Sequence, residues 1–256
     1  MTNERRVLVH PDKDALVSAV SSRFLTKMVD IIDDLGSANV CLTGGTVGTA
    51  VLAAIAASPA RDTIAWSKVH FWWGDERWVD ADSNERNEKG ARSALLDHLD
   101  VPERNVHPFA ASDSGLELDA AADAYAADLA SSGDGTTPYP RFDITFLGVG
   151  PDGHIASLFP ERSGIRETER TVIAVRDAPK PPPERLSLTR PVINASARIW
   201  MVLSGADKAS ALGLALAGAS YTEVPAAGAK GRKRTVFFVD REAAAEVPES
   251  LISPEY

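Results

Sequence analysis

The chain has 256 residues, of which 44% are hydrophobic and 25% are charged, and its formal net charge is −9. This length and composition are typical of a globular protein with one large α/β domain or two small ones. The acidic balance argues against a nucleic acid partner. The single cysteine, Cys41, excludes an internal disulfide and suits a reducing compartment. The first residues contain no apolar run of signal-peptide or membrane-span length, so we expect a cytoplasmic protein without membrane contact.

Apolar runs of strand length alternate with helical patterns along the chain. Strands are predicted at residues 5–10, 40–43, 69–73, 144–149, 171–175, 199–203 and 235–239. Helices are predicted at residues 12–35, 47–57, 83–99, 116–130 and 207–217. In the first helix, spacings of three and four place six apolar residues on one face, namely Leu16, Val20, Phe24, Met28, Ile31 and Leu35.

This alternation implies crossover connections, and therefore an α/β fold with a mostly parallel central sheet and helices on both faces. The segments 131–140 and 178–183 are rich in glycine or proline and are the only plausible linkers. Neither is long enough to demand a second domain, so we predict a single domain over residues 1–256.

A glycine-rich turn follows the second predicted strand in LTGGTVGTA, and a helix begins near Thr46. Backbone N–H groups at a helix N-terminus attract anions, and Gly44 and Gly45 would let a phosphate approach closely. The segment lacks the lysine and spacing of a P-loop. A plain tight turn capped by Thr46 fits the same pattern, and spacing alone does not separate the two interpretations.

Three charged residues, Asp75, Glu76 and Arg77, directly follow the third strand in WWGDERWV. The carboxyl ends of strands in an open α/β sheet face the ligand crevice, and the fork of Arg77 suits a phosphate or carboxylate. A surface salt bridge of Arg77 is the alternative. We expect at least two of the tryptophans at 72, 73 and 78 to lie in the core.

The fourth strand ends in glycines and a tight turn that carries Asp152 and His154, within FDITFLGVGPDGHIASLFP. Histidine suits proton transfer near neutral pH, and a structural histidine is the alternative. The formal G-x-G-x-x-G match here does not favour a dinucleotide, because Asp152 would repel a pyrophosphate and Pro151 lacks an N–H. The other histidines lack this context and are interpreted as structural, namely His10, His70, His98 and His107.

A lysine, Lys208, occupies the first turn of the helix predicted in LSGADKASAL. A cation there opposes the helix dipole, which suggests a role such as holding a phosphate, although a solvated lysine is the alternative. Arg185, after the proline-rich loop, is a further candidate cation. The sequence has no cysteine pair, no HExxH and no closely spaced histidines, so no metal site is predicted.

Taken in order, LTGGT, WWGDERWV, GPDGHIASLFP, RLSLT and SGADKASAL resemble the 6-phosphogluconolactonase family over residues 40–212. The GPDGHIASLFP run is the most specific of these elements. The family belongs to a wider group with a Rossmann-like sheet that includes the glucosamine-6-phosphate deaminases. The resemblance implies hydrolysis of 6-phosphoglucono-1,5-lactone, a small phosphorylated sugar lactone, in the oxidative pentose phosphate pathway, without a cofactor.

The resemblance also implies roles for individual residues. The acid/base residue would be His154, with Asp152 beside it and Arg77 as a charge-stabilising group. The substrate-binding candidates are Gly44, Gly45, Thr46 and Lys208 for the phosphate, together with Asp75 and Arg185. We expect a monomer, with a homodimer as the alternative.

Two other functions stay open on the residues alone. Amino-sugar-phosphate deaminases share the DGH core, but their motif continues HIAFNEP, with a glutamate where this chain has Phe159. Without that glutamate the deaminase proton relay lacks a member, although Asp75 lies where the deaminases keep a base. A sugar-phosphate-binding protein without catalysis would use the same phosphate loop but would not need His154.

Overall fold

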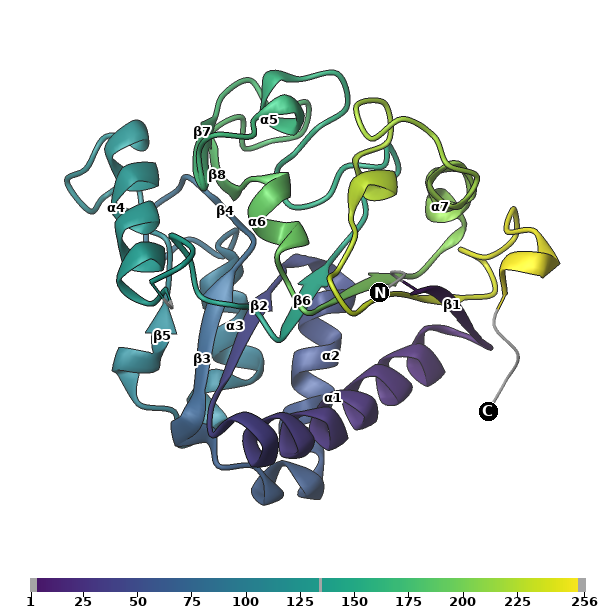
Figure 1. Cartoon of the computed structure of the whole chain (residues 1–256), viewed down its shortest axis with the longest axis horizontal. Helices are drawn as coiled ribbons and strands as arrows, with labels where there is room; N and C mark the ends of the chain where they lie inside the picture. The colour runs from purple at the N-terminus through teal and green to yellow at the C-terminus, as the bar shows by residue number, and fades with distance from the viewer. Residues whose placement is uncertain (1–3, 134, 253–256) are drawn as a thin grey trace.

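A parallel sheet organises the part of the protein that the computed structural model describes, residues 4–133 and 135–252 (Figure 1). Within these residues the sheet has seven strands, and every pair of neighbours is parallel. In spatial order the strands are β1 (Glu4–His10), β10 (Arg234–Asp240), β9 (Arg198–Leu203), β6 (Ile144–Leu147), β2 (Ala38–Leu42), β3 (Val69–Trp73) and β5 (Val106–His107).

Helices cover both faces of this sheet, which confirms the predicted α/β fold. Figure 1 shows α1 and α2 on one side, and α6 and α7 toward the other. In chain order the α-helices of the described residues are α1 (Lys13–Leu35), α2 (Gly45–Ala57), α3 (Asn87–Ala94), α4 (Leu118–Ser131), α5 (Ser163–Arg166), α6 (Arg190–Asn194) and α7 (Ala209–Leu216).

The longest helix, α1, forms where the apolar spacing predicts it. The Asp12 side chain caps its start by accepting a hydrogen bond from the Ala15 N–H at 2.8 Å, and Gly36 ends it with φ of 80°. Its apolar face is buried from Leu16 to Ile31. Leu35 at the end of this face is 50% exposed, because it is the last residue before the chain turns away at Gly36.

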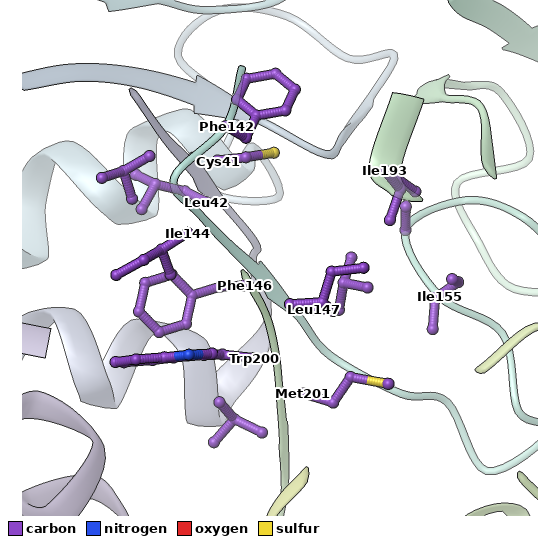
Figure 2. Close-up of a cluster of buried hydrophobic side chains, with 14 of the residues drawn as sticks. Cys41, Leu42, Phe142, Ile144, Phe146, Leu147, Ile155, Ile193, Trp200 and Met201 are labelled. Carbon is purple, nitrogen blue, oxygen red and sulfur yellow. The ribbon is translucent and has the colours of Figure 1, made fainter. Parts of the chain in front are cut away.

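The hydrophobic core lies on both sides of the central strands (Figure 2). On one side Phe146 packs between Phe24 of α1 and Trp200 of β9, with ring centroids 5.6 Å from each. On the other side Leu147 and Met201 point toward Ile155 and Ile193. Because strand side chains alternate between faces, these short buried strands bury apolar residues on both sides, as parallel sheets do.

A second, smaller sheet lies beside the carboxyl end of β3. Among the described residues it has three antiparallel strands, in the order β4 (Asp75–Arg77), β8 (Arg185–Leu188) and β7 (Val172–Val175). Gly74 joins the two sheets, because its N–H donates to the Leu42 carbonyl at 3.0 Å and its carbonyl accepts from the Leu188 N–H at 2.9 Å. The charged segment Asp75–Arg77 is therefore held as a strand, which the sequence analysis did not predict.

Several predicted boundaries differ from the structure. The helix predicted at 83–99 was wrong at both ends, since only Asn87–Ala94 is α-helical and a 3₁₀ turn follows at Leu96–His98. The predicted loop at 131–140 includes position 134, which lies outside the described residues. In the described ranges, no helix combines the length and the apolarity that crossing a membrane requires.

Candidate active site

A cavity of about 290 Å³ opens at the carboxyl ends of the adjacent strands β2 and β6. Its floor is backbone, Thr43 to Gly45 after β2 and Gly148 to Gly150 after β6. Nine further residues line it, of which seven are polar or charged, namely Asp75, Arg77, Asn87, His154, Lys180, Arg185 and Lys208. The cavity therefore lies where open α/β sheets bind ligands, and four cations line it although the chain as a whole is acidic.

A second cavity of about 320 Å³ continues from the first along the start of α2. The two cavities share Gly44, Gly45 and Lys208, while Thr46 and Ser204 line only the second. The structure thus brings together all but one of the predicted site residues along one continuous surface. The exception is Asp152, which does not line either cavity and contacts His154 instead.

His154 and Asp152 form a hydrogen-bonded pair. The Nδ1 atom of His154 lies 2.5 Å from Oδ1 of Asp152, and the imidazole is mostly buried, with 16% of the side chain exposed. Burial opposes ionisation of Asp152, but the hydrogen bond to His154 and the imidazole charge lower its pKa to about 2. An ionised carboxylate only accepts hydrogen bonds, so Nδ1 of His154 carries a proton, and in the neutral imidazole the lone pair is then on Nε2.

Glycine at position 150 makes room for this pair. A Cβ atom at residue 150 would overlap with Nδ1 of His154 and with Oδ1 of Asp152. The turn is closed by the Gly150 N–H, which donates to the His154 carbonyl at 2.9 Å, and by the Gly153 N–H, which donates to the Gly150 carbonyl at 2.9 Å. Gly153 itself has φ of 82°, a conformation that L side chains rarely adopt.

The glycine loop after β2 presents the start of α2 to both cavities. Gly44 is the N-cap of α2 and provides no side-chain cap, so first-turn N–H groups are left for other acceptors. Together with the helix dipole these donors favour an anion, and Lys208 lines the same surface. Lys208 lies at the end of the 3₁₀ turn Ala206–Lys208 and not inside an α-helix as predicted, and its Nζ is 3.0 Å from Oδ2 of Asp207.

The Asp75 carboxylate is buried in the cavity wall. Its Oδ2 accepts a hydrogen bond from the Ser157 hydroxyl at 2.7 Å. The Asn87 amide donates to the Asp75 backbone carbonyl at 2.9 Å. Strand β4, the HIASLFP segment and helix α3 are thus tied together at this one residue.

Glu76 points away from the cavity and organises the start of α3. Its carboxylate accepts hydrogen bonds from the backbone N–H groups of Arg77 at 2.8 Å, Asn87 at 2.7 Å and Glu88 at 2.9 Å. Burial raises the pKa of Glu76 to about 7, although these N–H groups and the charge of Arg86 act to lower it. This residue takes the place of the missing N-cap side chain of α3.

The two arginines of the cavity are held by the protein itself. Nη1 of Arg77 donates to the Glu85 carbonyl at 2.6 Å. The Arg185 guanidinium is buried and donates to three successive carbonyls of the proline-rich loop, those of Lys180, Pro181 and Pro182. Burial lowers the pKa of Arg185, whose guanidinium carbon also lies 5.7 Å from the centre of the Phe159 ring.

The profile of a family described as glucosamine-6-phosphate isomerases/6-phosphogluconolactonase matches residues 11–238. The chain belongs to this family. Among curated members it is 48% identical over 258 residues to a 6-phosphogluconolactonase of Streptomyces coelicolor, with 99% of each chain covered. It is also 48% identical to a 6-phosphogluconolactonase of Mycobacterium tuberculosis, over 94% of this chain and 97% of the relative.

Solved structures of the family have the same fold. The 6-phosphogluconolactonase of Thermotoga maritima superposes with a TM-score of 0.81 at 27% identity, covering 93% of this chain and all of the other. A monomeric glucosamine-6-phosphate deaminase gives a TM-score of 0.77 over 94% of this chain and 99% of its own. At 21% identity, the likeness to the deaminase shows the fold alone.

Three polar residues of the cavity were not predicted from sequence, namely Thr43, Asn87 and Lys180. Asn87 is ten residues beyond Arg77 and reaches the cavity only because Glu76 fixes the start of α3. Lys180 lies in the loop that its prolines predict, and its positive charge was the one available signal. Neither residue has a local pattern that identifies it.

The histidines interpreted as structural lie outside both cavities. His107 stacks on Trp72 with ring centroids 3.7 Å apart, and its Nδ1 is 3.0 Å from Oδ2 of Asp128. Trp72 and Trp73 are fully buried, as expected, and the Cys41 thiol is buried as well, which raises its pKa. In residues 4–133 and 135–252, no three potential metal-ligating His, Cys, Asp or Glu side chains are grouped together.

Proposed function

We propose that this family member hydrolyses 6-phosphoglucono-1,5-lactone to 6-phosphogluconate, the second step of the oxidative pentose phosphate pathway. The observation that supports the proposal most directly is that a candidate proton acceptor and a candidate anion site lie along the same cavity surface. A hydrogen-bonded Asp152–His154 pair borders the same cavity as a glycine loop at a helix N-terminus with Lys208. One ligand can therefore meet an anion site at one end and a proton acceptor at the other.

The phosphate binds at the start of α2. Gly44 and Gly45 present backbone N–H groups there, Thr46 adds its hydroxyl, and Lys208 supplies a positive charge. Fixing the phosphate at this end orients the lactone carbon at the other end, which lowers the entropic cost of bringing the reacting groups together. Asp75 and Arg185 complete the wall around the sugar ring.

The chemical step uses the lone pair of His154. Its Nε2 takes a proton from a water molecule as the water oxygen bonds to the lactone carbonyl carbon. The negative charge that develops on the carbonyl oxygen is stabilised by Arg77. The bond between that carbon and the ring oxygen then breaks, and His154 returns the proton to the departing ring oxygen. Asp152 stabilises the imidazolium that exists between the two transfers.

The surroundings of His154 favour this reaction over deamination. Where the deaminase motif has a glutamate, this chain has Phe159, whose ring packs against the His154 imidazole with centroids 4.7 Å apart. A phenyl ring cannot transfer a proton, so a ring-opening relay through this position is missing. A protein that only binds sugar phosphates would not require the hydrogen-bonded Asp152–His154 pair.

We further infer that the enzyme acts in the cytoplasm as a monomer. Two observations support this inference. The single cysteine is a free, buried thiol, as expected in a reducing compartment. The residues assigned to both ends of the substrate all come from one chain.

The test is lactonase activity of the wild type beside His154→Ala and Lys208→Ala. The lactone is generated in situ from glucose 6-phosphate, and formation of 6-phosphogluconate is followed above spontaneous hydrolysis. We expect His154→Ala to lose on the order of 10²–10⁴-fold in kcat while the fold is retained. Lys208→Ala should raise KM more than it lowers kcat, because Lys208 contacts the phosphate and not the reacting carbon.

Two results would contradict the proposal. If folded wild-type protein does not accelerate hydrolysis, lactonase activity is wrong, and release of ammonia from glucosamine 6-phosphate becomes the next assay. If His154→Ala loses less than about tenfold, the activity stands but His154 is not the general base.

A further inference from the structure

The cations that surround His154 differ in what they already bind. Arg77 donates to the Glu85 carbonyl, and Arg185 donates to three carbonyls of the loop 178–183. Lys180 lines the same cavity, and within the described residues its ammonium makes no hydrogen bond or ion pair. Unlike the two arginines, Lys180 therefore has all the N–H donors of its ammonium available for a ligand.

Arg185 holds the loop that carries Lys180. Four of the six residues in 178–183 are prolines, so the loop has few N–H groups with which to fix itself. Only one backbone hydrogen bond closes it, from the Ala178 N–H to the Pro183 carbonyl at 3.0 Å. The Arg185 guanidinium supplies three more, at 3.0 to 3.1 Å, from a buried position over the Phe159 ring. The fork geometry of arginine suits this role.

Lys180 lies at the His154 end of the surface and not at the phosphate end. It lines the cavity with His154, whereas the second cavity, around Thr46 and Ser204, contains Lys208 without Lys180. Its charge acts on the Asp152 carboxylate, which is hydrogen-bonded to His154. Lys208, by contrast, is paired with Asp207.

We propose that Lys180 is a catalytic residue that contacts the lactone carbonyl oxygen, and that Arg185 is a positioning residue that acts through it. The ammonium donates a hydrogen bond to the oxygen as negative charge develops there, and Lys180 stays protonated throughout. It shares this charge with Arg77, and no bond to Lys180 forms or breaks. The inference rests on the proposed lactonase function.

The test compares Lys180→Met, which removes the charge and keeps the length of the side chain, with Lys180→Arg. Lys180 is exposed, so neither change is expected to disturb folding. We expect Lys180→Met to lower kcat by about 10-fold to 100-fold with KM changed less than about threefold, since the contact strengthens only in the transition state. Lys180→Arg should recover most of the loss. Lys68→Met, at an exposed lysine before β3, is the matched control and should be unchanged.

The pH dependence of kcat/KM separates an effect of the Lys180 charge from a purely structural effect of the substitution on the loop 178–183. Removing the positive charge near the Asp152–His154 pair makes His154 easier to protonate. The acid limb of kcat/KM should therefore move to higher pH in Lys180→Met and return toward the wild-type position in Lys180→Arg.

Arg185→Lys tests the positioning role, because a lysine cannot bridge three carbonyls. If Arg185 acts through Lys180, kcat of the double variant Arg185→Lys/Lys180→Met should equal that of Lys180→Met within about twofold. If the fold-losses in kcat of the two single variants multiply in the double variant, Arg185 does not act through Lys180. Should Arg185→Lys fail to fold, the Lys180 variants alone decide the catalytic role.

The outcomes separate this inference from the function on which it rests. An active wild type whose kcat is unchanged in Lys180→Met overturns the role of Lys180 and leaves the lactonase function standing. A rise in KM at constant kcat also overturns it, because the contact would then be made equally in the ground state. A wild type without lactonase turnover removes both.

Discussion

In the mechanism that we propose, Asp152 acts on His154 through charge as well as through orientation. Oδ1 of Asp152 lies 2.5 Å from Nδ1 of His154, and a proton held on Nδ1 would leave Nε2 as the proposed base. Its negative charge would also stabilise the imidazolium that forms when the water is deprotonated. An asparagine of the same shape could still accept the hydrogen bond, but it would supply no charge, so the two contributions can be separated by substitution.

For Asp152→Asn we expect kcat to fall on the order of 10²-fold or more, because the imidazolium loses its counter-charge. Protonation of His154 becomes harder, so the acid limb of kcat/KM should move to lower pH, opposite to the shift expected for Lys180→Met. The measurement is a pair of pH–rate profiles on folded variants. An unchanged acid limb would mean that Asp152 only orients the ring.

The ionisation of Asp152 should also appear in the stability of the protein. The pKa of this carboxyl is about 2 in the folded state, below its ordinary value of 3.8, so the ionised form stabilises the fold. That contribution is complete above about pH 4 and is lost as the pH falls toward 2. The difference in unfolding free energy between wild type and Asp152→Asn should shrink over the same window.

The sequence is most informative about residues that are close in the chain. Asp152 and His154 are two positions apart, and the glycines around them indicate a tight turn, so both could be assigned to one site, while their hydrogen bond is seen only in the structure. Asn87 and Lys180 reach the cavity through contacts with Asp75, Glu76 and Arg185. No periodicity encodes such contacts, which depend on how β4 and the proline-rich loop pack.

At the level of elements, Glu76 shows how a strand of three residues can position a helix. Strand β4 pairs with β8, which turns Glu76 inward against the start of α3. Residues 83–86 carry a helical composition but form turns instead, with the Arg86 N–H donating to the Ser83 carbonyl at 3.2 Å. The helix begins at Asn87 because Glu76 offers its acceptors there, which explains the error in the predicted helix at 83–99.

Removing this acceptor should destabilise the protein more than neutralising it. Glu76→Ala would leave three backbone N–H groups without their partner, and we expect a loss of about 3 kcal/mol in the free energy of unfolding. Chemical denaturation measures this loss. A cost below about 1 kcal/mol would show that water replaces the carboxylate without penalty.

Glu76→Gln is the matched variant, and its effect should depend on pH. The folded-state pKa of Glu76, about 7, lies above the ordinary 4.5, so folding favours the protonated carboxyl. The wild type should therefore lose stability from this group as the pH rises from about 4.5 through about 7. The glutamine variant cannot ionise and should lack this component. If the free energy of unfolding depends on pH in the same way in both proteins, the raised pKa of Glu76 is contradicted.

At the scale of the whole molecule, the two sheets share one hydrophobic core and line one cavity. Gly74 bonds to β2 on one side and to β8 on the other, and the Ser157 hydroxyl links the HIASLFP segment to Asp75. Six of the seven strands in the central sheet could be predicted because each contains a buried apolar run, whereas the two-residue strand β5 was missed. The small sheet was missed because two of its strands, β4 and β8, are short and begin or end in charged residues that mark a site rather than a strand.

These links predict that both sheets unfold together, as a single domain should. Under native conditions the amide hydrogens of Leu188 in β8 and Phe146 in β6 should exchange with solvent at the same opening free energy, equal to that of global unfolding. Both residues are buried, and the Leu188 N–H bonds directly to Gly74. Hydrogen exchange at increasing denaturant, compared with the transition in tryptophan fluorescence, measures the two energies. If Leu188 exchanges at a lower opening energy than Phe146, the small sheet opens by itself, and the walls that hold Arg77 and Arg185 form a separate unit.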